Sequence, residues 1–227
     1  EARCYTHEGA RQDTEFFLKH MPQIGRPMQS GLAHTEWLAE AEAQEFAFAE
    51  ARFRGWKAGE AFILATPGHS PDSVAVYVPG SHALFTGDTT WYVSPNNQRG
   101  SVRLLLGSAA NLRALAATER VSYLGHGHYP PVTGEKAVFD WLLGYEMKEK
   151  SLVSQIDKVI AGKERVTVEA CLARLRQSSS PAVKEAFEIN FPRLPSYIDV
   201  FLGVLLREKG WQRVDRAEGG AWVAPEA

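Results

Sequence analysis

The chain has 227 residues, of which 44% are hydrophobic and 23% are charged, and its formal net charge is −2. Such a composition is typical of one large globular domain, or of a domain and a half. A net charge near zero gives no support for binding to nucleic acid or anionic membranes, and no apolar run approaches the ~20 residues that span a bilayer. Cys4 and Cys171 are expected to be buried, reduced thiols, which favours a cytoplasmic location.

The first fifth of the chain predicts short elements of both kinds. Residues 2–7 have the composition of a strand, and residues 13–20 that of a short helix capped by Asp13. Residues 21–31 carry two prolines and two glycines, which predict a loop. Residues 34–44 are rich in helix-forming side chains and predict a second helix.

Strands are predicted from there onward. Apolar residues alternate with charged ones over 45–54, and a second apolar run at 61–65 follows a turn at 56–60. Residues 74–78 and 83–85 flank a Pro-Gly-Ser turn, so they are expected to lie next to each other in a sheet.

Two polar side chains stand at the ends of this last pair of strands. His69 lies in the loop before the first strand, and Asp88 lies just past the end of the second. Because the two strands run in opposite directions, these ends fall on the same rim of the sheet. A histidine and a carboxylate on one rim are half of a plausible metal site.

The stretch that follows Asp88 is rich in polar and turn residues and begins with Trp91 and Tyr92. A loop here would overhang the rim, because it leaves directly from Asp88. The two aromatic side chains either form an apolar wall of a substrate pocket or cover the edge of the sheet.

A third polar loop comes after the next helix and strand. The helix is predicted over 108–118, with Ser108 as its N-cap. The strand is predicted over 121–124, and it ends in the string Gly-His-Gly-His that contains His126 and His128. The glycines allow the backbone to come close to a metal.

Beyond Gly134 the pattern becomes mainly helical. Helical periodicity predicts helices over residues 135–161, 167–177, 182–188 and 196–209. Thr167 and Ser196 are the predicted N-caps of the second and the last of them. Residues 211–224 then predict a β-hairpin, and three helices followed by a hairpin form a winged-helix-like arrangement.

Three motifs therefore stand in order along the chain: Thr-Pro-Gly-His-Ser at 66–70, Thr-Gly-Asp at 86–88 and Gly-His-Gly at 125–127. Together they resemble the metallo-β-lactamase-fold hydrolases, a superfamily that includes glyoxalase II enzymes, lactonases, thioesterases, nucleases and β-lactamases. The C-terminal region is similar to the extension of the β-lactamase-like protein 2 group. The resemblance implies an α/β fold, the αββα sandwich, with a hydrolase domain over 1–134 and a helical, winged-helix-like region over 135–227.

One element of the superfamily pattern is missing from the sequence. The signature His-x-His-x-Asp-His, which precedes these motifs in the superfamily, does not occur. Residues 2–8 resemble the strand that normally follows it. The sequence is therefore expected to start after the first half of the sandwich.

The resemblance also implies roles for the polar residues on the rim. His69 would bind one metal, Asp88 would bridge two metals as the central catalytic group, and His126 would bind the second. His128 competes with His126 for that role. His128 and His7 are also the candidates for residues that lie next to the metal ligands without binding a metal themselves. Imidazole nitrogen and carboxylate oxygen suit Zn²⁺, and also Fe²⁺ or Mn²⁺.

Two classes of function remain open. The first is a hydrolase in which two Zn²⁺ ions hold a hydroxide that attacks an ester, thioester, lactone or similar bond of a small molecule. The second is a degenerate, non-catalytic protein that acts as a binding or regulatory module through its C-terminal region. Basic and acidic residues offset each other in that region, which argues against nucleic acid as a partner, and a homo-oligomer is left open.

Overall fold

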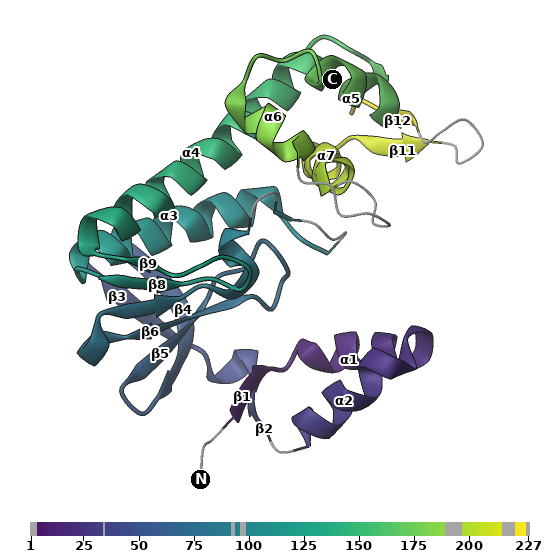
Figure 1. Ribbon diagram of the computed structural model, residues 1–227. Coiled ribbons are helices and arrows are strands. Elements are labelled where there is room, and N and C mark those ends of the chain that lie inside the picture. Colours follow the sequence, from purple (N-terminus) through teal and green to yellow (C-terminus); the bar gives the residue numbers. More distant parts are fainter. Residues whose placement is uncertain are drawn as a thin grey trace.

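The computed structural model describes residues 4–33, 35–91, 94–95, 99–188, 197–214 and 221–225 (Figure 1). Within these residues, the strands of a seven-stranded sheet follow one another in chain order. They are β3 (Gln44–Phe48), β4 (Ala51–Ala58), β5 (Ala61–Ala65), β6 (Val74–Val78), β7 (Ala83–Phe85), β8 (Tyr123–Gly125) and β9 (Val132–Thr133). Neighbouring strands are antiparallel, except that β7 and β8 are parallel.

Two long helices cover one face of this sheet. A parallel strand pair needs a crossover, and α3 (Val102–Thr118) provides it between β7 and β8. α4 (Glu135–Ile160) packs beside α3 over the same face (Figure 1). The layer between helices and sheet is a buried apolar core that includes Leu64, Tyr77, Leu84, Leu112, Leu115 and Leu142. The structure therefore confirms the predicted α/β class.

The strand predictions around the first two motifs are confirmed. β5 and β6 pair, and β6 pairs with β7, both in the antiparallel sense. The prediction of one strand over 45–54 is wrong in detail, because the chain reverses between β3 and β4. Ala49 has φ +51 at that reversal, a left-handed conformation that the alternating pattern of side chains does not reveal.

The N-terminal helices differ from the prediction. α1 (Ala10–His20) begins three residues before Asp13, with Gly9 at its N-cap position. Residues 21–31 are not a loop, because α2 (Pro22–Leu32) covers them. Pro22 sits at the first turn, where a missing N–H costs nothing. A Cβ on Gly25 would lie 2.3 Å from the backbone nitrogen of Leu18, so the two helices pack more closely than larger residues would allow.

The helix predicted over 34–44 is also wrong. Its place is taken by the strand β2 (Thr35–Leu38), which pairs in parallel with β1 (Cys4–His7), and by a 3₁₀ turn at Glu40–Glu42. Trp37 lies beneath the guanidinium of Arg11, 4.1 Å from it. Pairing with β1 and this contact outweigh the weak helix propensity of the segment.

The N-cap of α3 is Ser101 rather than Ser108. The Ser101 hydroxyl accepts a hydrogen bond from the amide of Leu104, whereas Ser108 lies inside the helix. The buried Ser108 hydroxyl donates to the carbonyl oxygen of Pro67 at 2.8 Å. This bond ties α3 to the loop that carries His69.

The C-terminal residues form helices around a small sheet. The helices are α5 (Val168–Leu175), α6 (Pro181–Glu188) and α7 (Tyr197–Glu208), and the sheet has the order β10 (Arg165–Thr167), β12 (Ala221–Val223) and β11 (Gln212–Val214). The predicted hairpin is confirmed by the antiparallel pairing of β11 with β12. Thr167 caps α5 as predicted, through the amide of Ala170, whereas Ser196 lies outside the described residues.

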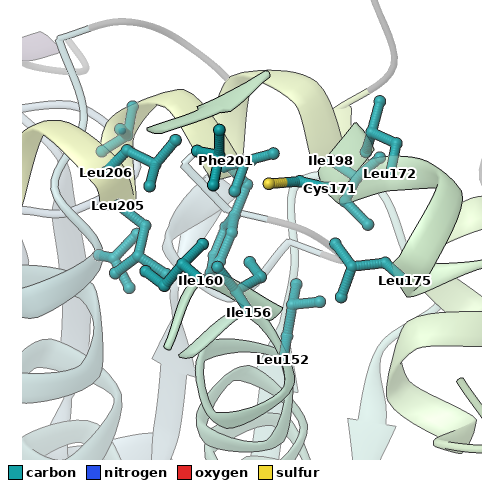
Figure 2. Packing of buried hydrophobic residues seen from close by; sticks show 14 of the residues in the cluster. Leu152, Ile156, Ile160, Cys171, Leu172, Leu175, Ile198, Phe201, Leu205 and Leu206 are labelled. Carbon is teal, nitrogen blue, oxygen red and sulfur yellow. The ribbon is translucent and has the colours of Figure 1, made fainter. Parts of the chain in front are cut away.

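A second apolar core lies in this region (Figure 2). Ile156, Cys171, Phe201 and Leu205 meet there, each at most 4% exposed. α4 belongs to both cores, because Leu142 lies in the first one and Ile156 in the second. The predicted domain boundary at 134/135 stays a prediction, and the helix that begins there joins the two halves.

Two features bear on the compartment of the protein. Cys4 and Cys171 are both free thiols; Cys171 is buried as expected, but Cys4 is exposed. Among the described residues, no helix is both long enough and apolar enough to cross a membrane.

Candidate metal centre

Three loops meet at one rim of the seven-stranded sheet. The first joins β5 to β6 and carries His69, the second follows β7 and carries Asp88, and the third follows β8 and carries His128. Because β6 and β7 are antiparallel and β7 and β8 are parallel, these loops must leave the sheet on the same side.

Asp88 is the centre of this group of side chains. Its Oδ2 lies 3.8 Å from Nε2 of His69, and its Oδ1 lies 3.2 Å from Nε2 of His128. His69 is the most buried of the three, with 14% of its side chain exposed, against 37% for Asp88 and 49% for His128. The two carboxylate oxygens thus face two different imidazoles on a rim that solvent can reach.

Glycine makes this approach possible. The amide of Gly127 donates to the carbonyl oxygen of Gly87 at 3.1 Å, which holds the third loop against the second. A Cβ on Gly127 would lie 2.3 Å from Oδ1 of Asp88. Any larger residue at this position would have to displace the carboxylate.

Buried hydroxyl groups hold the loops in position. Nδ1 of His69 lies 3.0 Å from Oγ of Ser94, which is buried. Thr66 and Thr89, also buried, bond to each other through their hydroxyls at 2.9 Å. Burial is the main cause that lowers the pKa of His69, although the Asp88 carboxylate acts against it. A neutral imidazole is the form that binds metals.

His126 points elsewhere. Its Nδ1 lies 3.2 Å from Oγ1 of Thr90, and its ring lies against Trp141 of α4, with 4.1 Å between the ring centres. Its buried Nε2 has no hydrogen-bond partner within the described part of the chain. Burial lowers the pKa of His126 to about 4. The role of His126 as a metal ligand stays a prediction, and the structure brings His128 to Asp88 instead.

The remaining candidates are placed as follows. Trp91 stacks on His128, with ring centres 4.1 Å apart and planes at 23°, so it covers one side of the rim. Tyr92 lies outside the described residues. His7 pairs with Glu40, with 3.0 Å between Nε2 and Oε1, and its ring meets Trp56 edge-on, so its contacts are with Glu40 and Trp56.

The donor chemistry of this rim suits a divalent cation, but the ligand set is small. Two imidazoles and one carboxylate meet pairwise, so each carboxylate oxygen has one histidine as its neighbour. Structural and catalytic zinc sites use three or four protein ligands. Among the described residues, no group of three or more His, Cys, Asp or Glu side chains is arranged to hold a metal ion. The described residues therefore fit part of a metal site, not a complete one.

Sequence reasoning found His69 and Asp88 but missed the residues that support them. Ser94 and Thr90 carry no motif, and Trp141 lies on a helix far along the chain from His126. The only signal for Ser94 is its place in the loop that leaves Asp88. The only signal for Trp141 is its position on the apolar stripe of α4.

Comparison with known proteins shows which folds this chain resembles. The chain matches no protein-family model. It resembles the solved structure of a stereoselective inverting sec-alkylsulfatase from Pseudomonas sp., with 15% identity and a TM-score of 0.50, over 77% of this chain and 26% of that one. A metallo-β-lactamase family protein from Thermus thermophilus aligns at 18% identity and a TM-score of 0.49, over 99% of this chain and 72% of that one.

The chain has the metallo-β-lactamase fold. The sheet order and the two helices that cover one face of the sheet agree with this assignment. At these levels of identity the likeness concerns the fold alone, so activity and ligands are treated as proposals below.

Proposed function

We propose that this protein is a metal-dependent hydrolase of the metallo-β-lactamase superfamily that acts on a small molecule. The bond that it cleaves is an ester, thioester, lactone or similar bond. The observation that carries the proposal is the pair of contacts at Asp88, whose two oxygens face His69 and His128 on an open rim. The contact between Asp88 and His128 is solvent-accessible, and an exposed ion pair stabilises a fold by only about 0–1 kcal/mol, so stability alone gives little reason for that contact.

Each side chain has a distinct role in the proposal. His69, held neutral by burial and positioned by Ser94, supplies one imidazole nitrogen. Asp88 supplies both oxygens and would bridge two cations, and His128, stacked on Trp91, supplies the second imidazole. Zn²⁺, Fe²⁺ or Mn²⁺ bound here would polarise the scissile carbonyl and lower the pKa of bound water. Trp91 forms an apolar wall beside the reacting bond.

One observation favours the alternative function, a degenerate protein without catalytic activity. The described residues supply one histidine per carboxylate oxygen and no complete ligand set. On this alternative the rim has lost its metals, and the protein acts as a binding or regulatory module through its C-terminal helices and sheet. The first proposal predicts hydrolysis that depends on a bound metal, whereas the second predicts neither hydrolysis nor bound metal.

The test is hydrolysis of a panel of simple aryl esters, thioesters and lactones, with and without added Zn²⁺ or Mn²⁺. The account predicts turnover that a chelator abolishes, and a loss of about 100-fold or more in kcat/KM for His69→Ala. His20→Ala is the matched control, because His20 is an exposed histidine at the end of α1 whose ring contacts Phe16. Activity that resists chelation, or equal activity in both variants, would contradict the site assignment.

A further inference from the structure

A large pocket opens beside the candidate metal centre. It has a volume of about 720 Å³ and lies between α4, α6 and the loops that carry Thr90 and Tyr129. We call it the α4 pocket, because α4 supplies Trp141, Gly144, Tyr145 and Lys148 to its wall. α6 packs against α4 (Figure 1) and closes the far side with Glu185.

The pocket borders the rim through Thr90. Thr90 belongs both to its wall and to the 3₁₀ turn Gly87–Thr90 that contains Asp88. Thr90 also bonds to His126, whose ring packs on Trp141. The pocket therefore lies close to the rim in the chain, since Thr90 is two residues after Asp88, although none of His69, Asp88 and His128 lines it.

One wall of the α4 pocket is flat and aromatic. The rings of Trp141 and Tyr145 are almost parallel, with planes at 6° and centres 5.8 Å apart. The Tyr145 hydroxyl donates to the carbonyl oxygen of Thr89 at 3.0 Å, which fixes that ring. Met147, with 61% of its surface exposed, adds an adaptable apolar side chain at the pocket wall. Such a wall suits a flat or branched apolar group.

The charges of the pocket do not favour an anion. Among the lining residues that the structure describes, the one cation is Lys148, and its Nζ lies 3.3 Å from Oε1 of Glu185 and over the ring of Tyr145. Asp140, the other charged group in the lining, is an acid that pairs with Lys136 outside the pocket. Both acids and the cation of the described lining are thus already paired, so these side chains offer an anionic ligand no cation that lacks a partner.

We propose that the α4 pocket binds a neutral, flat or branched apolar group of the substrate, such as the aryl or cycloalkyl part of an ester or lactone. This inference rests on the proposed function for its link to catalysis, but the binding itself does not require activity. It assigns the selection of substrates to Trp141, against which the buried ring of Tyr145 stacks.

Gly144 offers a clean test. A Cβ on Gly144 would meet nothing within 4 Å, although the residue lines the pocket. Gly144→Leu should therefore fold normally and fill part of the pocket, since leucine is also a better helix former than glycine. Gly107→Leu is the matched control, because Gly107 is an exposed helical glycine of α3 with the same open surroundings.

The binding experiment titrates 2-naphthol and 2-naphthalenesulfonate into the three proteins by calorimetry, after circular dichroism has shown equal folding. We expect 2-naphthol to bind the native protein and Gly107→Leu equally, and Gly144→Leu about tenfold more weakly or worse. The sulfonate, with the same ring but a negative charge, should bind the native protein at least about tenfold more weakly than 2-naphthol. No binding of 2-naphthol, tighter binding of the sulfonate, or an unchanged affinity in Gly144→Leu would overturn the proposal.

A second readout separates this inference from the proposed function. Hydrolysis of 2-naphthyl acetate and of ethyl acetate is compared between the native protein and Gly144→Leu. A rise in KM for the naphthyl ester alone supports the pocket. If 2-naphthol binds as expected but neither ester is cleaved with any metal, the pocket stands and the hydrolase proposal fails. If both esters are cleaved equally by both proteins, the hydrolase proposal stands and the pocket proposal fails.

Discussion

Asp88 uses its two carboxylate oxygens for two different histidines, and this is the feature at the scale of single residues that most needs a functional explanation. His69 is held from the other side by Ser94, and His128 is held by the stacked ring of Trp91. Both imidazoles are thus oriented by contacts that do not involve Asp88. Orientation of metal ligands by such outer contacts is typical of metal sites.

The relative roles of His126 and His128 can be separated by single substitutions. His128→Ala should weaken Zn²⁺ binding by at least about tenfold, because it removes the imidazole that lies 3.2 Å from Asp88. His126→Ala should change Zn²⁺ affinity much less and instead lower stability, because its ring packs on Trp141. A competitive zinc titration of both variants measures this. The opposite order of affinities would restore the ligand role that the Gly-His-Gly motif predicts for His126.

At the scale of secondary-structure elements, α4 contains an unusual buried acid. Glu149 is 1% exposed on the apolar stripe of the helix, and neither of its carboxylate oxygens has a hydrogen-bond partner among the described residues. Burial raises the pKa of Glu149 well above its ordinary value, Lys148 acts against this, and Glu185 of α6 adds to it. A buried carboxyl group without partners is a cost to the fold.

This cost predicts a pH-dependent stability. Since the pKa of Glu149 is raised in the folded chain, the folded state keeps this proton at pH values where the unfolded chain has lost it, and stability falls as the pH rises above the ordinary value of 4.5. Below that value Glu149 is protonated in both the folded and the unfolded state, so it causes no loss of stability. Glu149→Gln should therefore be more stable than the native protein by about 1–3 kcal/mol at pH 7, with the difference vanishing near pH 4.

Urea unfolding at both pH values measures this difference. Glu50→Gln, at an exposed turn between β3 and β4, is the matched control and should change stability at neither pH. A Glu149→Gln variant that loses stability at pH 7 would show that the ionised carboxylate has a favourable partner.

Elements could be predicted from the sequence where one strong pattern governed a long segment. The stripe of α4 and the strands around the first two motifs were of this kind, because side-chain period and burial agree there. Residues 34–44 failed because β2 is stabilised by its parallel partner β1, a contact that local composition does not contain. Residues 21–31 failed because Gly25 permits close packing of α2 on α1, which compensates for two prolines and two glycines.

At the scale of the whole molecule, the two cores are joined by the helices that cover the sheet. α4 contributes to both, and Val102 at the start of α3 packs in the C-terminal core. Glu208 of α7 accepts hydrogen bonds from the Ser101 hydroxyl and the Arg103 amide. These contacts connect the C-terminal helices to the helices that cover the sheet.

The candidate site was predictable in its framework but not in its detail. His69 and Asp88 could be predicted because strand direction alone brings their loops together. The choice between His126 and His128 depends on how a four-residue string turns at the rim, where Gly127 passes within reach of Asp88. The α4 pocket depends on the meeting of α4 with α6, which only the packed structure provides.

We propose that Asp88 is the bridging ligand of a metal site, and the metal content of the purified protein tests this most directly. Elemental analysis of the native protein and of Asp88→Asn, both purified without added metal, gives the number of bound cations per chain. The account predicts about two divalent cations in the native protein and a loss of both in Asp88→Asn with the fold intact. A folded native protein without metal, or equal metal content in the two proteins, would contradict the account.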